Sequence, residues 1–284
     1  MNTFEGKVAA ITGAGSGMGR TLAMQLAREG CEVAISDIDE VGLAETVKQL
    51  HGARVTSQRL DVADREAVFA WADRVVADHG RCNLIFNNAG VALAASAEST
   101  TPEDFHWIMN INFWGVVNGT QAFLPHLRRA AEGHVINTSS LFGLVAFPSN
   151  SAYNATKFAV RGYTEALRIE LDMQHLPIGV TCVHPGGIKT KIARSARVRD
   201  SITRELGIPI EEAGSFEKLF KVTAEEAAEI ILDGVRRNQS RVLVGNDART
   251  MDVVQRLAPQ LYQRLLTYVA NKRNAKWLKR ATEA

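Results

Sequence analysis

The sequence contains few cysteines and no long apolar run. Cys31, Cys82 and Cys182 stand singly among 284 residues, and none belongs to a CxxC pair. Isolated thiols exclude a disulfide framework and a cysteine-rich zinc site, and they fit buried residues in a reducing compartment. No run of about 18 apolar residues occurs, and the start MNTFEGKVAAITGAG lacks an apolar core behind a basic segment. We therefore expect a cytoplasmic protein without an integral membrane segment.

The sequence also lacks a charge excess and any metal-binding spacing. Its 33 basic and 31 acidic residues leave a net charge of +2, which does not favour nucleic acid as a partner. No HExxH motif occurs, and His106, His126, His134, His175 and His184 are isolated on different predicted elements. We therefore predict no catalytic metal.

The composition is that of an ordinary globular protein, with 46% hydrophobic and 23% charged residues. Seven short apolar runs rich in β-branched residues alternate with segments of helical period. These runs cover residues 7–12, 31–37, 53–61, 83–89, 134–140, 178–185 and 241–245. Strands of continuous apolar character, separated by helices, form parallel sheets covered on both faces. We therefore predict an α/β fold with three layers, a doubly wound parallel sheet of the Rossmann type.

Helical patterns of the required length lie between these runs, for example over residues 64–79 and 152–174. Two helix starts carry capping residues. Thr101 precedes a proline and two acids, and Thr223 precedes a glutamate at the third following position. Both patterns predict helices that begin directly after the threonine.

No repeat or Gly/Ser linker divides the chain, so we expect one domain over residues 1–284. Residues 191–222 break the strand–helix rhythm, which indicates a substrate-loop insertion near a site. A basic cluster at its start either meets an anionic substrate group or faces solvent, and comprises Lys189, Lys191, Arg194, Arg197 and Arg199. The tail at residues 247–284 has helical spacing, basic residues and Trp277, so it faces solvent, an anionic membrane or a neighbouring subunit.

A glycine-rich turn, TGAGSGMG from Thr12 to Gly19, follows the first predicted strand and precedes a helical pattern. Glycines let the backbone approach a pyrophosphate, and the free N–H groups at the start of the helix attract the anion. The alternative is a tight strand–helix connection without a ligand.

The next predicted strand ends at Asp37. A carboxylate there accepts hydrogen bonds from an adenosine ribose and repels a 2′-phosphate, which favours NAD over NADP. Alternatively, Asp37 only opens the loop before the next helix. Arg20 is the nearby basic residue that would weaken the preference for NAD.

A tyrosine and a lysine stand four residues apart twice, as Tyr153 and Lys157 in SAYNATKFAV and as Tyr268 and Lys272 in TYVANKR. Residues i and i+4 share a helix face, so the two side chains of each pair can point into one space. A tyrosine titrates at about pH 10 and becomes a usable base at neutral pH when nearby positive charge lowers its pKa. Spacing alone does not distinguish the two pairs.

The glycine motif Thr-Gly-x-x-x-Gly-x-Gly resembles that of the short-chain dehydrogenase/reductase family, and further family motifs follow in order over residues 6–190. The resemblance implies four catalytic positions, namely Asn112, Ser140, Tyr153 and Lys157. Ser140 precedes Tyr153 by the thirteen residues typical of the family, whereas Gln255 holds the equivalent place before Tyr268. We therefore assign chemistry to Tyr153 and interpret Tyr268 as a helix residue of the tail.

The same resemblance implies a cofactor site built from the glycine turn, an Asp-Val pair on the adenine side, the NNAG signature and the segment PGGIKT, which holds the nicotinamide. Its members are Gly13, Ser16, Gly17, Met18, Gly19, Asp37, Ile38, Asp61, Val62, Asn88, Ala89, Gly90, Tyr153, Lys157, Pro185, Gly186, Ile188 and Thr190. In this scheme Tyr153 removes a hydroxyl proton while the substrate carbon gives a hydride to NAD. Ser140 bonds the substrate oxygen, and Asn112 anchors a water beside Lys157.

The expected function is NAD-dependent interconversion of a secondary alcohol and a ketone. LFGLVAFPSNSA and VALAA carry no charge, which favours a lipophilic substrate, although core packing explains the same residues. Alternatives are an NADP-dependent carbonyl reductase and a non-catalytic NAD(H)-binding regulatory protein. The resemblance also implies a homodimer or homotetramer that assembles through the helices carrying Asn112 and Tyr153.

Overall fold

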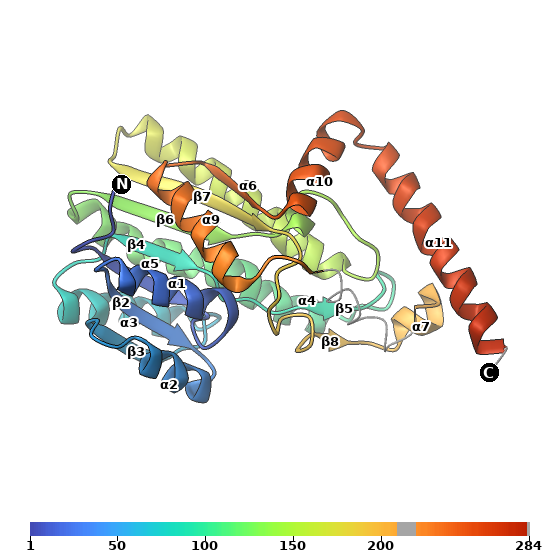
Figure 1. The fold of residues 1–284 in the computed structure, drawn as a ribbon, viewed down its shortest axis with the longest axis horizontal. Helices are drawn as coiled ribbons and strands as arrows, with labels where there is room; N and C mark the ends of the chain where they lie inside the picture. Colours follow the sequence, from blue (N-terminus) through green and yellow to red (C-terminus); the bar gives the residue numbers. More distant parts are fainter. Residues whose placement is uncertain (209–219, 283–284) are drawn as a thin grey trace.

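The computed structural model describes residues 1–208 and 220–282, and the side chains of these residues except those of 273–282. Seven strands form one parallel sheet in the order β3-β2-β1-β4-β6-β7-β9 (Figure 1). They are β1 (Val8–Thr12), β2 (Glu32–Asp37), β3 (Val55–Arg59), β4 (Leu84–Asn87), β6 (Gly133–Thr138), β7 (Ile178–Pro185) and β9 (Arg241–Val244). Each predicted strand run is a strand, so the predicted doubly wound sheet is confirmed.

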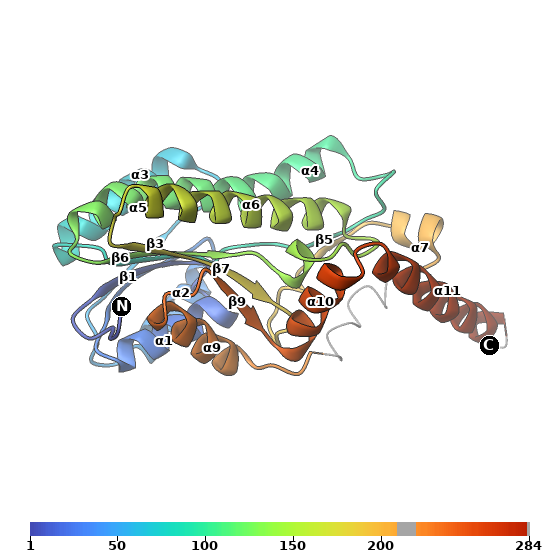
Figure 2. The ribbon, with the colours of Figure 1, turned by 90° about the horizontal axis from the view of Figure 1, so that it is seen from above.

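Helices cover both faces of this sheet (Figure 2). One face carries α1 (Gly17–Arg28), α2 (Glu40–Gln49) and α9 (Ala224–Arg236), and the other carries α3 (Arg65–His79), α5 (Gly115–Arg129) and α6 (Ser151–Met173). Each face has its own buried apolar cluster, with Leu22 and Ile231 on the first and Trp71 and Phe123 on the second. Burial of these clusters is the main force that holds the three layers together.

Capping residues set where several helices begin. Asp64 accepts a hydrogen bond from the N–H of Ala67 at the start of α3. Thr101 caps α4 (Pro102–Met109), and Thr223 forms a capping box with Glu226 at the start of α9. The two predicted helix starts at threonines are therefore confirmed.

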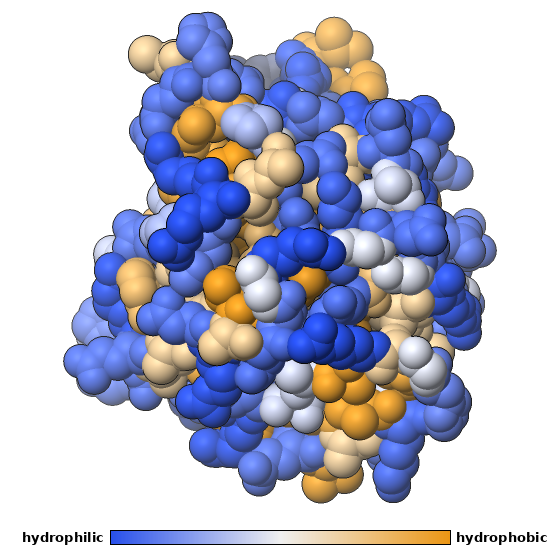
Figure 3. Space-filling model, turned by 90° about the vertical axis from the view of Figure 1, so that its left-hand side faces the viewer, coloured by the Kyte–Doolittle hydropathy of each residue, from blue (hydrophilic) through white to orange (hydrophobic). Residues whose placement is uncertain are grey.

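The chain reverses its direction of winding between β1 and β4. From β1 it moves outward to β2 and β3, then returns to place β4 on the other side of β1. Ligands of open α/β sheets bind at such a switch point, beside the carboxyl ends of the strands. The glycine turn follows β1 and the NNAG signature follows β4, so both lie at this point. The face at the opposite, amino ends of the strands is largely hydrophilic (Figure 3).

Shorter elements lie beyond the carboxyl edge of the sheet. They are β5 (Leu93–Ala94), a π-helical turn η1 (Asn110–Trp114), a 3-10 turn η2 (Leu141–Gly143), β8 (Arg197–Val198) and α7 (Ser201–Leu206). β5 and β8 form a separate two-stranded sheet. The insertion predicted for 191–222 contains β8 and α7, and its residues 209–219 lie outside the described part of the chain.

The tail contains α10 (Asn246–Leu257) and α11 (Leu261–Thr282), and α11 points away from the body in both views (Figures 1 and 2). Near its start, Tyr262 packs against Leu141 and Val145 after β6. The prediction made for Trp277 concerns a side chain outside the described ones. Among the helices that the structure describes, none has both the length and the apolar character needed to cross a membrane.

Candidate active site

The glycine turn lies tightly against the segment that follows β4. Gly13 and Gly17 have φ values of +68° and +53°, which favour glycine. A Cβ on Gly13 would lie 2.7 Å from the Cα of Ala89, and a Cβ on Gly19 would lie 2.1 Å from the carbonyl oxygen of Gly13. No side chain fits at these positions, so the backbone N–H groups at the start of α1 stay accessible, as a pyrophosphate requires.

Thr12 and Asn88 fix this turn to β4. The Asn88 side-chain amide donates to the carbonyl oxygens of Thr12 at 3.1 Å and Gly13 at 3.3 Å. The Thr12 hydroxyl accepts from the N–H groups of Asn88 at 3.0 Å and Ala89 at 3.1 Å. Thr12 was not predicted as a site residue, although its place directly before the first glycine was a usable signal.

Asp37 ends β2 beside the turn. Its carboxylate accepts from the N–H of Gly15 at 2.8 Å and from the N–H of Asp39 at 3.0 Å. The neighbouring Ile38 is 56% exposed. The Asp37 carboxylate is thus held at the carboxyl edge of the sheet, next to the glycine turn.

Arg20 is engaged between α1 and α2. Its guanidinium donates to the carbonyl oxygens of Gly15 and Gly42 and to the hydroxyl of Thr46, and it pairs with Glu45 at 3.0 Å. These contacts occupy several of its donors.

The remaining predicted cofactor residues lie directly after β3 and at the start of α1. Val62 is buried and its carbonyl accepts from Asn118 at 3.1 Å, while Asp61 accepts from the N–H of Ala63 at 2.9 Å. Ser16 is the N-cap residue of α1, its side chain makes no capping hydrogen bond, and Met18 packs against the core.

The segment after β7 closes on the glycine turn. Pro185 ends the strand, and a Cβ on Gly186 would meet the carboxylate of Asp247. Ile188 is buried, and Thr190 lies so close to α1 that a Cβ on Gly17 would be 3.2 Å from its Cγ2. The two segments predicted to hold the pyrophosphate and the nicotinamide are therefore neighbours.

Ser140, Tyr153 and Lys157 meet at the end of β6. Ser140 starts η2, where its side chain accepts from the N–H of Phe142 at 3.1 Å, and its side chain is close enough to Tyr153 to lower the pKa of that residue. The Lys157 Nζ lies 5.6 Å from the centre of the Tyr153 ring. α6 thus presents Tyr153 and Lys157 on one face, as their spacing predicts.

Asn112 completes the group from the other side. It is fully buried in the π-helical turn η1, where its side-chain oxygen accepts from the N–H of Val91 at 2.8 Å and its amide donates to the Val91 carbonyl at 2.9 Å. A Cβ on Gly90 would lie 3.2 Å from the Asn112 Oδ1 and 3.6 Å from the Lys157 Nζ. Gly90, Asn112 and Lys157 therefore converge on one point, and single π-turns of this kind often occur at functional sites.

Burial dominates the electrostatics of the site. It raises the pKa of Tyr153 to about 12, an effect that the hydrogen bond from Ser140 opposes. It lowers the pKa of Lys157 to about 8. We expected Lys157 to lower the tyrosine pKa, but burial and Ser140 set that pKa here, and the Lys157 ammonium donates instead to the carbonyl of Thr138 at 3.0 Å. At pH 7 the site therefore holds a neutral phenol beside an ammonium.

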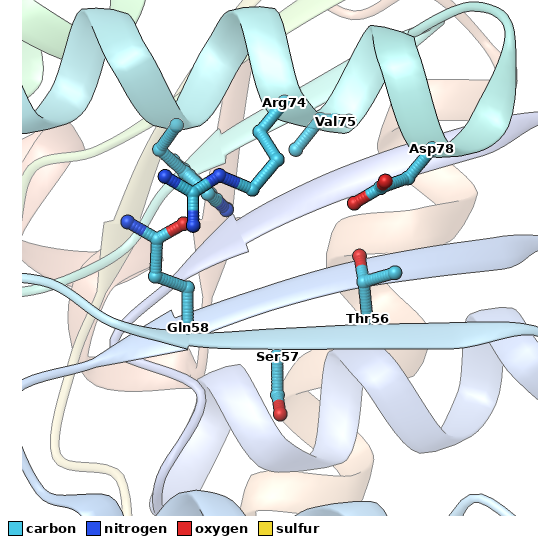
Figure 4. A pocket seen from close by; sticks show the side chains of 7 residues that line it. Thr56, Ser57, Gln58, Arg74, Val75 and Asp78 are labelled. Carbon is cyan, nitrogen blue, oxygen red and sulfur yellow. The ribbon is translucent and has the colours of Figure 1, made fainter.

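The second Tyr-Lys pair lies elsewhere. Tyr268 is on α11 and is 63% exposed. A separate hollow between α3 and β3 is lined by Thr56, Gln58, Arg74 and Asp78 (Figure 4), and it contains none of the predicted site residues. In the described part of the chain, no three His, Cys, Asp or Glu side chains are grouped to hold a metal ion.

A glycine turn at the switch point of a Rossmann sheet, next to a Ser-Tyr-Lys group, defines a dinucleotide-binding oxidoreductase. A family model described as short chain dehydrogenase matches residues 7–200. SadH of Mycobacterium tuberculosis, whose name describes an oxidoreductase, is 50% identical over 273 residues, which cover 94% of this chain and 96% of SadH. The chain belongs to the short-chain dehydrogenase/reductase family.

Solved structures agree with this assignment. A short-chain dehydrogenase/reductase from Burkholderia phymatum, in complex with NAD, has a TM-score of 0.82 and 30% identity, with 92% of this chain and 97% of that chain covered. A short-chain dehydrogenase from Mycobacterium paratuberculosis, bound to NAD, has a TM-score of 0.74 and 28% identity, with 87% and 99% covered. The protein is therefore an oxidoreductase with a Rossmann fold.

Proposed function

We propose that this protein is an NAD-dependent dehydrogenase that interconverts a lipophilic secondary alcohol and its ketone. The observation that carries the proposal is the convergence of Ser140, Tyr153, Lys157 and Asn112 beside Gly90, at the mouth of the glycine turn. A non-catalytic NAD(H)-binding regulator would not need these four side chains together.

The chain's own residues perform the proton transfer. In ketone reduction, the Tyr153 hydroxyl gives its proton to the oxygen of the substrate, and in alcohol oxidation the phenolate takes that proton back. The Ser140 hydroxyl donates a hydrogen bond to the same oxygen, where negative charge develops. Lys157 and Asn112 place polar side-chain groups next to Gly90. When bound, the nicotinamide supplies or accepts the hydride.

The preference for NAD is supported by Asp37 and Arg20. Asp37 keeps a carboxylate at the end of β2, where it would repel a 2′-phosphate. Arg20, the residue that would weaken this preference, has its donors engaged by Gly15, Gly42 and α2 side chains. Binding of NADPH that is clearly tighter than binding of NADH, in equilibrium titrations at the same salt concentration, would overturn this proposal.

A lipophilic substrate is supported by the rings around Tyr153. Phe142 stacks on Phe147 with ring centres 4.5 Å apart, and it forms a T-shaped pair with Tyr153 in which the ring centres are 5.8 Å apart. Tyr153 also packs against a buried cluster that includes Leu93 and Ile108. Apolar walls of this kind bind the carbon skeleton, while the few polar groups orient the reacting oxygen.

We also propose a homodimer or homotetramer in the cytoplasm. α6 and the end of η1 carry four exposed large apolar side chains, Trp114, Phe158, Ile169 and Met173. Their burial between copies would supply the driving force for assembly. Size-exclusion chromatography with light scattering gives the molar mass and thus the number of copies. The cytoplasmic location is supported by the three buried, free cysteines.

The decisive experiment combines a substrate screen with a matched pair of variants. Alcohols graded by size and polarity are tested with NAD⁺ and NADP⁺, and the most active one is used for kinetics. Tyr153→Phe is expected to reduce kcat by at least about 100-fold, with cofactor binding retained. Tyr268 also stands four residues before a lysine, and Tyr268→Phe is expected to leave kcat unchanged. Unchanged turnover in Tyr153→Phe would show that the catalytic assignment is wrong.

A further inference from the structure

The segment from Lys191 to Ile208 lies close to the start of α6, the helix that carries Tyr153. Its strand β8 pairs with β5, and the N–H groups of Arg197 and Arg199 donate to the carbonyl oxygens of Ala92 at 3.0 Å and Ala94 at 2.9 Å. On the other edge of β5, Ala95 is bridged to Asn150, three residues before Tyr153. β8 is thus separated from the start of α6 by a single strand.

This pairing by itself is weak. β5 and β8 have two residues each, and so short a ladder does not hold an exposed segment in place. Ile202 is fully buried and anchors the segment further along the chain. The part next to β5, Arg197 to Arg199, therefore depends on side-chain contacts for its position.

Asp104 of α4 provides those contacts. Its carboxylate is only 3% exposed and accepts two hydrogen bonds from Arg199, both 2.7 Å long, in the paired geometry of a guanidinium and a carboxylate. The Arg197 guanidinium lies 3.7 Å from the same carboxylate and 3.5 Å from the centre of the Trp107 ring. A buried carboxylate is tolerated only when it is compensated, and both compensating cations belong to the β8 segment.

The contact extends from this pair to the proposed catalytic tyrosine. Trp107 packs against the buried cluster of Leu93, Ile108 and Ala152, which Tyr153 also contacts. Further along, Glu205 accepts hydrogen bonds from the hydroxyls of Ser96 and Ser99, which fixes α7 to the loop after β5. The segment is therefore fastened at two places to elements that border Tyr153.

We propose that Asp104 is a positioning residue for substrate binding, because it fixes Arg197 and Arg199 and thereby holds the β8 segment as one wall of the substrate site. This inference rests on the proposed function, since it takes the space beside Tyr153 as the place of the alcohol or ketone. It also accounts for two residues of the basic cluster, Arg197 and Arg199, whose charges neutralise Asp104. Lys189 and Lys191 remain exposed at the start of the segment.

The first test compares Asp104→Asn with Glu103→Gln. Both changes remove one negative charge from the first turn of α4, so both weaken its favourable interaction with the helix dipole. Only Asp104→Asn removes the contact with the arginines. We expect Asp104→Asn to raise the KM for the most active alcohol by about tenfold with a smaller change in kcat, and Glu103→Gln to leave both constants unchanged.

A second measurement does not depend on turnover. Limited trypsin digestion, followed by mass spectrometry, gives the cleavage rate after Lys191 in the folded protein. We expect Asp104→Asn and Arg199→Gln to increase this rate about tenfold each. The double variant is expected to be cleaved no faster than either single variant, because both changes break the same contact.

The outcomes separate the two proposals. Faster cleavage in Asp104→Asn with no alcohol turned over by the unmodified protein supports the contact and overturns the proposed function. Additive effects of the two changes on cleavage, or a KM that rises equally in Glu103→Gln, overturn the positioning role of Asp104. Equal melting temperatures of Asp104→Asn and Glu103→Gln exclude general destabilisation of α4 as the cause.

Discussion

Replacing Gly19 with alanine is expected to weaken dinucleotide binding by about 100-fold. The new Cβ would lie 2.1 Å from the carbonyl oxygen of Gly13 and 2.7 Å from the Asn88 amide nitrogen, whereas real Cβ contacts stay above 3.0 Å. The turn and the start of α1 must therefore separate by about 0.9 Å, a shift that breaks hydrogen bonds of ordinary length. Losing two N–H bonds to a phosphate at about 1.5 kcal/mol each costs about 3 kcal/mol, which corresponds to this factor.

Gly162→Ala is the matched control. Gly162 lies inside α6, and a Cβ there meets no atom within 4 Å. This variant gains about 0.5 to 1 kcal/mol of stability from helix propensity and binds the cofactor normally. The dissociation constant of NADH is measured by fluorescence titration on variants whose fold is verified by circular dichroism. A folded Gly19→Ala protein that binds NADH as tightly as the unmodified protein would refute the reasoning.

Three further predictions follow from burial. The pKa values of His134 and His184 are lowered by burial to about 3 and about 4. In the unfolded chain these histidines take up protons at about pH 6.5. The free energy of unfolding is therefore expected to keep its full value above that pH. Between about pH 6.5 and pH 4 it is expected to fall by up to about 1.4 kcal/mol per pH unit for each histidine, because only the unfolded state binds the protons. An unchanged slope in His134→Gln would contradict this. The cysteine thiols, whose pKa values burial raises to about 12, are expected to resist a thiol reagent at pH 8 until the protein unfolds, and rapid labelling of the native protein would contradict this. Tyr262→Ala is expected to cost about 3 kcal/mol of stability, because the ring packs on Leu141 and Val145 in the loop after β6. The same change is expected to raise the KM for lipophilic substrates. A melting curve equal to that of the unmodified protein would show that α11 does not support this loop.

The large elements were predictable because their sequence signals are local. Apolar, β-branched runs marked six strands of the sheet, the more polar run at 53–61 marked β3, and capping residues marked the starts of α4 and α9. The two-residue strands β5 and β8 carry no such pattern. Residues 93–94 continue an apolar stretch, whereas residues 197–198 begin with an arginine, and their pairing joins segments about a hundred positions apart. Only the tertiary fold brings these residues together.

The site was predictable as a set of residues and less so as a set of contacts. The cofactor and catalytic positions stand in recognisable motifs, but no motif indicated that the Lys157 ammonium would donate to the carbonyl of Thr138. Asp104 was visible only as an acid in the first turn of a helix, a position where acids are common. Its role became visible when the structure placed Arg197 and Arg199 against it. Contacts between distant segments leave no periodic trace in a single sequence.

The two Tyr-Lys pairs show why burial, rather than spacing, gives such a pair its chemistry. Tyr268 is 63% exposed, and in bulk water the attraction between a phenolate and an ammonium about 4 Å apart is only about 1 kcal/mol, since water screens it. Lys157, in contrast, is 3% exposed. The effective dielectric constant around it is several times lower than in water, so a charge introduced there interacts more strongly with Tyr153. Burial alone raises the pKa of Tyr153, which keeps the proton on the phenol at neutral pH. The same burial makes that pKa highly sensitive to any charge bound nearby, so Tyr153 can exchange its proton during a reaction, whereas Tyr268 has no comparable environment.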